Sequence, residues 1–420
     1  MCGIVGIHFN EQRGLQELSS YVDLMSKAIN HRGPDGQGQW INHDNTLALG
    51  HRRLSILDLS DEGRQPKLCH SGTYVITFNG EIYNYIEIRG ELISLGIAFK
   101  GSSDTEVLIE AIDHWGFKEA LKRIRGMFAV GVYDIRNNIL WLARDRIGKK
   151  PLYYYQDHQS FIFASEIKGI LAVASVQVSI SNQAISDFLS LGYIIGKETI
   201  YNEILELEPG TILRFDLNTA ETKKHKYWEF PTQSQEILSQ PQIIEQVEKR
   251  LKESIRLRLR SDVPVGVFLS GGIDSGLITA LAASESAIPL KTFTVSFGAS
   301  VFDESSLARM VAARYGTEHT EIKLEPDIEQ LLPRVVRSFD EPFADPSAFP
   351  TYAISQEASK YVKVVLNGEG SDELFGGYRR IQAMRIIQKI QGGLNFLPEN
   401  TLKIITNLLP EPKGFRTKYS

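Results

Sequence analysis

Hydrophobic positions recur along the chain at two different spacings, and the change between them separates two parts. In the first part, short apolar runs with strand-like spacing follow one another, and only a few helical patterns intervene. Many short strands with few helices predict a sheet-rich, layered first domain over residues 1–218. The expected strands are residues 4–7, 47–49, 74–78, 127–133, 140–143, 152–155 and 161–164, and the expected helices are 15–30, 85–95 and 104–115.

The second part of the chain follows a polar stretch. Residues 219–241 are expected to form a linker, because Pro231–Pro241 is rich in Gln, Ser and Thr. From residue 242 onward, helical and strand patterns alternate, which is typical of a parallel sheet covered by helices. The expected order is helix 243–259, strand 263–269, helix 276–284, strand 290–297, helix 304–315 and strand 362–366. We therefore expect an α/β domain over residues 242–420.

The composition narrows the class of protein. The 420 residues carry a formal net charge of −5, which gives no basic surface for nucleic acid. No apolar run reaches the roughly 18 residues that cross a bilayer, and no secretory leader precedes Cys2. The two cysteines, Cys2 and Cys69, suggest neither a disulfide framework nor a zinc site. We therefore expect a reduced, cytoplasmic protein that binds neither nucleic acid nor membrane.

Cys2 is the first candidate for chemistry. Removal of Met1 would leave a residue that carries both a thiol and a free α-amine. The amine titrates at about 7.7–8.0 and the thiol near 8.5, so the amine can accept the thiol proton. The apolar residues 4–7 would hold this nucleophile on a strand. An isolated cysteine here is most simply a small apolar residue, but the motifs that follow favour a nucleophile.

Three further motifs in the first domain suit the binding and hydrolysis of an amide. Residues 51–56, HRRLSI, contain arginines, which bind a carboxylate through two parallel hydrogen bonds. Asn79 and Gly80 together offer a side-chain amide and a backbone N–H for an oxyanion. Residues 103–106, SDTE, begin an expected helix and supply an acid for a substrate ammonium, although alone they form a simple capping box.

The second domain contains a loop suited to phosphate. Ser270–Ser275, SGGIDS, joins an apolar strand to a helix, where backbone N–H groups and the helix dipole favour an anion. No lysine follows the glycines, so this is not the GxxxxGK[ST] phosphate loop. The alternative is a tight strand–helix turn without a ligand. Asp274 beside phosphates suits Mg²⁺, and the acidic loop Asn367–Glu373 should face it with a second metal ligand and a base.

Taken in order, these motifs resemble two known families. MCGIVG, HRGPDG, RLSI, NGEIYN, SDTE, GMFAVGVYD and ARDRIGKKPLYY are similar to class II glutamine amidotransferases of the N-terminal-nucleophile type. VPVGVFLSGGIDS, FDES, DEPFADPSAFPTY and GEGSDELFGGY are similar to the ATP-pyrophosphatase half of asparagine synthetase. Over residues 2–380 the chain thus resembles the glutamine-hydrolysing asparagine synthetase family. The resemblance implies a four-layer αββα sandwich followed by a doubly wound parallel α/β nucleotide-binding domain.

The resemblance also implies roles for individual residues. Cys2 would be the nucleophile, Asn79 with Gly80 would form the oxyanion hole, and Glu369 would act near an acyl-adenylate. Glutamine would be bound by Arg53, Leu54, Ser55, Ile56, Leu57, Asn79, Gly80, Glu81 and Asp104. ATP would be bound by Leu269, Ser270, Gly271, Gly272, Asp274, Ser275, Val295, Asn367 and Gly368. Mg²⁺ would be held by Asp274 and Asp372.

The implied reaction is glutamine-dependent, ATP-consuming amidation of a carboxylate, with aspartate becoming asparagine and with AMP and pyrophosphate released. A sugar uronate of surface-polysaccharide synthesis is an alternative acceptor. The family usually continues further, with a downstream lysine that contacts the intermediate, and Lys403, Lys413 and Lys418 come too early to replace it. We therefore also consider a synthetase domain that is incomplete at its C-terminus and a protein that retains only glutaminase or binding activity. The family also suggests a homodimer.

Overall fold

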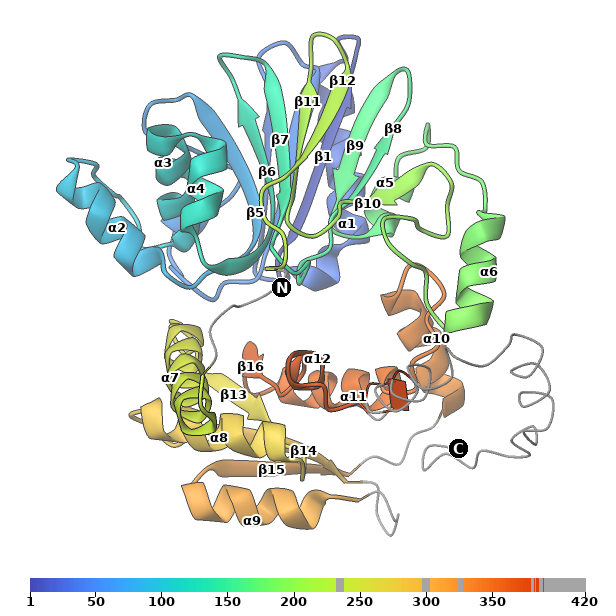
Figure 1. The fold of residues 1–420 in the computed structure, drawn as a ribbon. Helices are drawn as coiled ribbons and strands as arrows, with labels where there is room; N and C mark the ends of the chain where they lie inside the picture. Colours follow the sequence, from blue (N-terminus) through green and yellow to red (C-terminus); the bar gives the residue numbers. More distant parts are fainter. Residues whose placement is uncertain are drawn as a thin grey trace, which may run out of the picture.

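The computed structural model describes residues 1–231, 238–296, 303–323 and 328–378, together with Ile381, Ala383, Met384 and Gln388. Figure 1 shows two domains, with the first domain above the second. Part of the expected linker, and the end of the chain with Lys403, Lys413 and Lys418, lie outside the described residues.

The first domain is built on two antiparallel sheets of six strands each. The strands of one sheet follow the order β10-β8-β9-β1-β3-β2, and those of the other follow β12-β11-β7-β6-β5-β4. The first sheet contains β1 (Gly3–Phe9), β2 (Gly36–Ile41), β3 (Leu47–Arg53), β8 (Tyr153–Gln156), β9 (Ser160–Ala164) and β10 (Ile204–Glu206). The second contains β4 (Lys67–Leu68), β5 (Tyr74–Ile82), β6 (Gly126–Asp134), β7 (Ile139–Arg144), β11 (Thr211–Asp216) and β12 (Glu221–Lys226).

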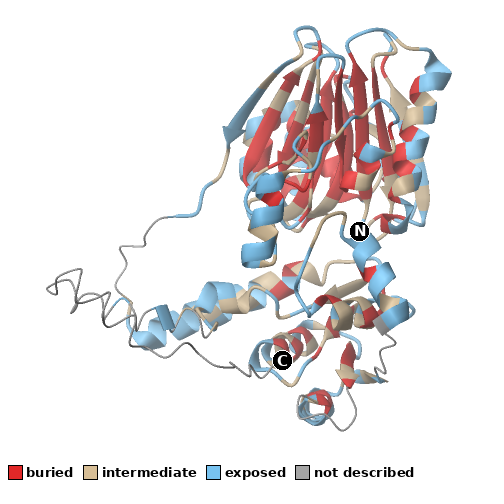
Figure 2. Ribbon diagram, turned by 90° about the vertical axis from the view of Figure 1, so that its right-hand side faces the viewer, coloured by how far each residue is buried: buried red, intermediate tan, exposed pale blue. Residues whose placement is uncertain are grey.

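Helices cover the outer faces of both sheets and complete the four layers. The first sheet packs against α1 (Leu15–Ala28) and α5 (Ile167–Leu171), and α3 (Asp104–Trp115) packs on β5 beside α2 (Tyr85–Ser94) and α4 (Phe117–Arg123). The remaining elements are α6 (Asn182–Leu191) and the short 3₁₀ helices η1 (Asn30–Arg32) and η2 (Asp61–Gly63). Large apolar side chains from both sheets, including Phe161, Phe163 and Phe215, are fully buried between them. Figure 2 shows this buried core in red, and the αββα prediction is confirmed.

The second domain has a four-stranded parallel sheet in the order β15-β14-β13-β16. Because β13 leads to β14 on one side and pairs with β16 on the other, the strand order reverses between β13 and β16, as expected for a doubly wound sheet. Its strands are β13 (Val265–Phe268), β14 (Lys291–Ser296), β15 (Glu318–Lys323) and β16 (Val364–Leu366). Its helices are α7 (Gln240–Arg258), α8 (Ile273–Glu285), α9 (Ser305–Tyr315), α10 (Ile328–Ser338), α11 (Ala348–Ala358) and α12 (Ser371–Phe375).

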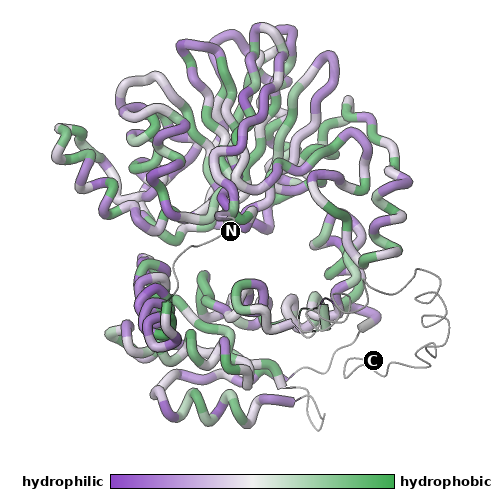
Figure 3. Tube along the Cα trace, in the orientation of Figure 1, coloured by the Kyte–Doolittle hydropathy of each residue, from purple (hydrophilic) through white to green (hydrophobic). Residues whose placement is uncertain are grey.

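Several features differ from the patterns of the sequence, and two of them concern the region between the domains. The strand β12 lies beyond the predicted boundary at residue 218, yet it pairs with β11 and extends the second sheet of the first domain. Its sequence, ETKKHK, is polar and mostly exposed, so no apolar alternation marks it as a strand. Within the expected linker, α7 begins at Gln240, and Figure 3 shows how hydrophilic this helix is. Among the described residues, none of the helices is both long and apolar enough to cross a membrane.

Polar contacts join the two domains. Arg260 donates to both carboxylate oxygens of Glu87, at 2.6 and 2.7 Å. On the other side of the interface, Lys168 Nζ lies 3.0 Å from Asp340 Oδ1, and the backbone N–H of Lys168 donates to Asp340 Oδ2. These contacts hold the two domains against one another at two separate places, one near the start of β13 and one just after α10.

Candidate functional site

Cys2 lies just before β1, a central strand of the first sheet, so packing on both sides holds its backbone. Its Sγ accepts a hydrogen bond from the N–H of Leu54 at 3.4 Å and donates to the carbonyl oxygen of Leu54 at 3.6 Å. Burial raises the pKa of the Cys2 thiol, although the Leu54 N–H and the terminal amine act in the opposite direction. The thiol is therefore protonated at neutral pH, and a base must accept its proton before it can attack.

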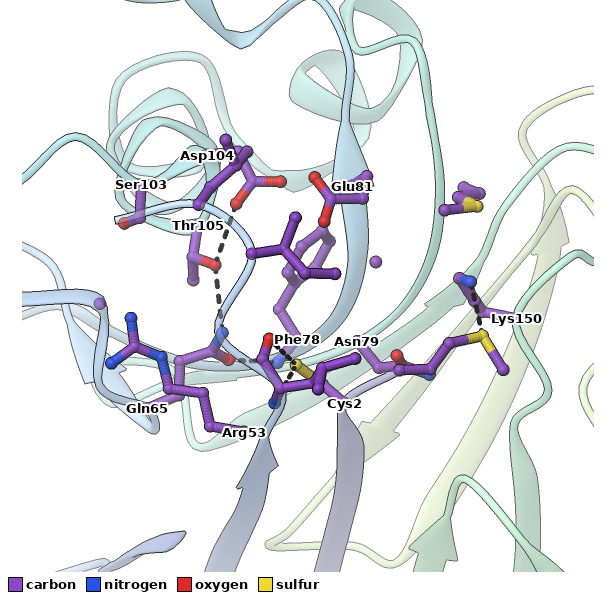
Figure 4. Close-up of a pocket in the computed structure, with 17 residues that line it drawn as sticks. Cys2, Arg53, Gln65, Phe78, Asn79, Glu81, Ser103, Asp104, Thr105 and Lys150 are labelled. Carbon is purple, nitrogen blue, oxygen red and sulfur yellow. Dashed lines mark hydrogen bonds between the residues drawn. The ribbon is translucent and has the colours of Figure 1, made fainter. Parts of the chain in front are cut away.

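Asn79 and Gly80 lie near the end of β5 and line the same pocket as Cys2, as Figure 4 shows for Asn79. Asn79 is 1% exposed, and its Nδ2 has no hydrogen-bond partner among the described residues. A buried donor without a partner is costly unless a ligand satisfies it. A Cβ at position 80 would lie 2.3 Å from the carbonyl oxygen of Met127, so the close pairing of β5 with β6 requires glycine here.

The half-buried Glu81 and the buried Asp104 form an acidic pair on one wall of the pocket, and Figure 4 shows their carboxylates directed toward one another. Burial raises the pKa of Asp104 to about 6, even though Asp104 Oδ2 accepts a 2.8 Å hydrogen bond from the N–H of Ile82. Burial and the neighbouring Asp104 raise the pKa of Glu81 well above its ordinary value. Two such carboxylates would be stabilised by a cation between them, such as a substrate ammonium.

Arg53 ends β3, and its side chain lines the pocket together with Leu54, Ile56 and Leu57. Its Nη1 donates to the carbonyl oxygen of Ser60, and its Nη2 donates to that of Asp58. The guanidinium thus fixes the chain that follows β3, and its other N–H groups remain available for a carboxylate. Ser55, in contrast, does not line the pocket: its N–H donates to Asp35 near the second domain.

The pocket contains residues that the sequence analysis did not assign. Gln65 Oε1 accepts a 2.6 Å hydrogen bond from the N–H of Phe78, and Gln65 Nε2 donates to Thr105 Oγ1 at 3.1 Å. Gln65 therefore links the residue before Asn79 to the residue after Asp104. Lys150 also lines the pocket, where burial and nearby Arg32 lower its pKa to about 8. Thr105 and Lys150 lie within the recognised motifs, whereas nothing in the sequence marks Gln65.

Met1 occupies part of this pocket, and Lys150 Nζ lies 2.7 Å from its sulfur. Burial lowers the pKa of the Met1 amine to about 5, and Arg32 and Lys150 act in the same direction. The Met1 amine is therefore neutral at pH 7.

Residues Ser270–Ser275, here called the phosphate-type loop, join a strand to a helix of the second domain, as the sequence predicts. It follows β13 and ends in α8, whose N-cap is Gly272. Ser270 and Ser275 hold the loop closed, because the N–H of Ser270 donates to Ser275 Oγ at 3.1 Å and the N–H of Gly272 donates to Ser270 Oγ. Asp274 is exposed in the first turn of α8, at the end of the helix where the dipole favours negatively charged ligands.

The acidic loop faces this site, as expected for the carboxyl ends of neighbouring parallel strands. A Cβ at Gly368 would lie 3.1 Å from the backbone nitrogen of Ser275 and 3.2 Å from Asp274 Cβ. Gly368 thus packs directly against the start of α8, and Asp372 follows on α12. Val295 lies near the carboxyl end of β14, while Leu269 is buried behind the loop. Asn367 and Glu369, on either side of Gly368, are exposed.

The donor set suits Mg²⁺ bound together with phosphates. Among the described residues there is no cluster of three or more His, Cys, Asp or Glu side chains that could hold a metal alone. Mg²⁺ usually takes one or two carboxylates plus substrate phosphates, so Asp274 and Asp372 are sufficient in chemistry and number. Their assignment as ligands remains a prediction.

A cysteine pocket in an αββα sandwich, joined to a doubly wound domain with a phosphate-type loop, defines a two-domain amidotransferase with a nucleotide-binding half. Residues 1–228 match the family model described as a glutamine amidotransferase domain, and residues 246–412 match that described as asparagine synthase. The chain is 38% identical, over 90% of its length, to a Methanocaldococcus jannaschii protein provisionally named asparagine synthetase (glutamine-hydrolysing) 2. It belongs to the glutamine-hydrolysing asparagine synthetase family.

Two further relatives show the breadth of this similarity. The chain is 38% identical to asparagine synthetase (glutamine-hydrolysing) 1 of Bacillus subtilis over its whole length, and 33% identical to amidase chry2 of Gibberella zeae over 88% of its length. The chain spans 76% of the M. jannaschii relative, 65% of the B. subtilis relative and 56% of the fungal one.

Proposed function

We propose that the chain hydrolyses glutamine at Cys2 and uses the ammonia, with ATP, to amidate a carboxylate. The observation that carries this proposal is one pocket that contains the Cys2 thiol, the Asn79 Nδ2, which has no partner among the described residues, and the acids Glu81 and Asp104. These groups match three features of glutamine: the reacting amide, its developing oxyanion and the α-ammonium. Membership of the family supports the same assignment.

The glutaminase step follows from these positions. After removal of Met1, the α-amine of Cys2 would accept the thiol proton, and the sulfur would attack the amide carbon of glutamine. Asn79 Nδ2 and the N–H of Gly80 would donate to the oxyanion. The α-ammonium of Cys2 then gives this proton to the departing nitrogen as the carbon–nitrogen bond breaks, so that ammonia leaves, and water hydrolyses the glutamyl thioester to glutamate and the free thiol. Arg53 would hold the α-carboxylate of the substrate throughout.

The second domain would activate the acceptor. The N–H groups of the Ser270–Ser275 loop and the N-terminus of α8 suit the phosphates of ATP. When bound, Mg²⁺ would neutralise phosphate charge, and Asp274 and Asp372 would hold it there. The acceptor carboxylate would attack the α-phosphate to give an acyl-adenylate and pyrophosphate, and ammonia would then displace AMP. Glu369 is proposed to accept a proton from the attacking ammonia.

Aspartate is the acceptor we propose, because two of the relatives above carry the name asparagine synthetase. The name of the fungal amidase chry2 leaves room for other acceptors, and a sugar uronate is the alternative. Pyrophosphate release in the presence of aspartate, compared with that in the presence of a nucleotide-linked uronate, distinguishes the two. Cytoplasmic location and a homodimer remain predictions.

Cys2→Ala tests the proposal. The variant should lose glutamine hydrolysis and glutamine-dependent amidation, yet still amidate aspartate with free ammonia, since the two sites lie in different domains. Cys69→Ala, which changes the other cysteine of the chain, is the matched control and should retain both reactions. Glutamine hydrolysis by Cys2→Ala at the wild-type rate would contradict the proposal.

A further inference from the structure

The glutamine pocket is closed on one side by residues 54–58, here called the pocket loop. Leu54, Ile56 and Leu57 of this loop line the pocket, and the N–H of Leu54 donates to Cys2 Sγ. From within the first domain, Arg53 holds the loop through the carbonyl oxygen of Asp58. The loop is also held from outside, by two residues of the second domain.

Asp262 holds one part of the pocket loop. Its Oδ2 accepts a 2.7 Å hydrogen bond from the N–H of Asp58, and its own N–H donates to the carbonyl oxygen of Ile56 at 3.1 Å. This pair of hydrogen bonds fixes both the position and the direction of the loop backbone. Asp262 lies just before β13, the strand that leads into the phosphate-type loop.

Lys363 holds the other part. Its Nζ lies 2.6 Å from Asp35 Oδ2 and 3.5 Å from the carbonyl oxygen of Ser55. Asp35 Oδ2 also accepts a 2.8 Å hydrogen bond from the N–H of Ser55, so one carboxylate oxygen joins the lysine to the pocket loop. Lys363 immediately precedes β16, the strand that leads into the acidic loop.

The two strands concerned are neighbours in the sheet, since Val265 of β13 pairs with Val364 of β16. They contain 4 and 3 residues. At about 3.3 Å per residue, each spans roughly 10–13 Å. The pocket loop and the two loops assigned to ATP therefore lie at opposite ends of the same two short strands.

We propose that Lys363 and Asp262 are positioning residues through which the second domain fixes the pocket loop for glutamine binding. The inference deepens the proposed function and rests on it. The contacts do not reach the reacting atoms of glutamine directly. They act through Ser55, Ile56 and Asp58 on the loop that carries Leu54, and so they should affect the affinity for glutamine more than the rate of the chemical step.

Lys363→Met tests the inference, because it keeps the length of the side chain and removes its charge. Lys360→Met is the matched control: Lys360 lies three residues earlier and pairs at 2.7 Å with Glu357 of its own domain. The side chains of Lys363 and Asp35 are 38% and 26% exposed. An ion pair that is exposed to this extent contributes only a modest free energy to holding the loop. We therefore expect the KM for glutamine to rise about three- to five-fold in Lys363→Met, with kcat changed less. Lys360→Met should match the wild type.

A double-mutant cycle with Asp35→Asn separates this role from a general loss of stability. If the two residues act as a pair, the change in KM of the double variant should be smaller than the product of the two single changes. The rate of amidation with free ammonia should stay within about two-fold of the wild type in both single variants and in the double variant. The loops assigned to ATP lie at the opposite ends of β13 and β16 from these contacts. An unchanged KM in Lys363→Met, or multiplicative effects in the cycle, would overturn the inference.

Failure of the proposed function has a different signature. In that case the wild-type chain itself would not hydrolyse glutamine, and Cys2 alkylation by iodoacetamide becomes the readout. Since Leu54 contacts the thiol, Lys363→Met should still change the pH profile of alkylation, whereas Lys360→Met should not. Identical alkylation profiles for Lys363→Met and the wild type would then overturn the inference separately.

Discussion

Arg32 Nε donates a 2.9 Å hydrogen bond to the carbonyl oxygen of Cys2. The same guanidinium pairs with Glu166 through its Nη1 at 2.7 Å, and Lys168 Nζ lies 2.8 Å from the other carboxylate oxygen. Since Lys168 also contacts Asp340 of the second domain, charged contacts run from the domain interface to the backbone of the proposed nucleophile. The orientation of Cys2 thus depends on side chains remote in the sequence.

Glu166→Gln should reduce stability. Burial alone would raise the pKa of Glu166, but His31, Arg32 and Lys168 outweigh it and lower that pKa to about 2 from an ordinary 4.5. The carboxylate therefore contributes stability above about pH 4.5 that is lost as the pH falls toward 2. Glutamine keeps a hydrogen bond to Arg32 but leaves this buried cation without its partner charge, at a cost of about 2–3 kcal/mol.

Urea unfolding at pH 7 and at pH 3 measures this effect. The difference between Glu166→Gln and the wild type should be large at pH 7 and smaller at pH 3. Glu248→Gln, which breaks an exposed pair with Lys252, is the control and should leave the urea midpoint unchanged. An equal difference at both pH values would mean that the charge of Glu166 is not the stabilising feature.

Asp104→Asn should make the protein more stable and less able to bind glutamine. Burial raises the pKa of Asp104 to about 6 from an ordinary 3.8, so the folded state holds a proton that the unfolded state has already lost. Stability therefore falls as the pH rises from about 4 to 6, and the amide removes this loss. In the wild type, the KM for glutamine should fall as the pH rises through about 6, because the ionised carboxylate binds the ammonium.

Thermal unfolding and glutamine kinetics between pH 4 and 8 test both statements. Asp113→Asn provides the control, since Asp113 lies on the same helix outside the pocket and accepts a hydrogen bond from Ser71. It should change neither the KM for glutamine nor its pH dependence. If Asp104→Asn were instead less stable than the wild type at pH 7, a partner in the folded protein would already stabilise the ionised carboxylate of Asp104.

The sequence predicts the strongly patterned parts of the fold. The apolar residues of β1, β5 and β6 lie in buried strands, and the alternation of helix and strand after residue 242 corresponds to the parallel sheet. The strands β2, β4, β10, β11, β12 and β15 have no counterpart among the predicted strands, and in β12 and β15 the residues are polar or only partly buried. Such strands are defined by backbone pairing with a neighbour, which leaves little trace in hydrophobicity.

The site is predictable where one short motif supplies a group and unpredictable where groups meet across the fold. Asn79 with Gly80 could be selected from NGEIYN alone. The contact of Lys363 with Asp35 spans 328 positions of sequence, and the link from Gln65 to Thr105 joins a loop to a helix. No local pattern encodes these contacts, because they depend on how the layers and the two domains pack.

Asn79→Ala should lower the kcat for glutamine hydrolysis about 10²–10³-fold, the usual effect of removing one oxyanion donor. Its stability should not fall, because the variant deletes a buried Nδ2 that has no partner among the described residues. Asn84→Ala, in the same motif, should behave oppositely. Asn84 Nδ2 donates to the carbonyl oxygen of Arg123, and its Oδ1 accepts from the N–H of Arg125, so its loss should destabilise without slowing catalysis. Steady-state kinetics and urea unfolding of both variants distinguish the two roles.

Asp274→Ala should lower pyrophosphate release and leave glutamine hydrolysis intact. Asp274 lies at the start of α8 against Gly368, where the phosphate-type loop meets the acidic loop, and its proposed task is to hold Mg²⁺. If so, Asp274→Asn should be partly restored by a higher Mg²⁺ concentration, because an amide oxygen is a weaker but usable ligand. Glu285→Ala, at the other end of the same helix, controls for loss of an acid from α8 and should release pyrophosphate at the wild-type rate. Pyrophosphate release by Asp274→Ala at that same rate, with the same Mg²⁺ dependence, would remove Asp274 from the metal site and leave Asp372 as the remaining candidate ligand.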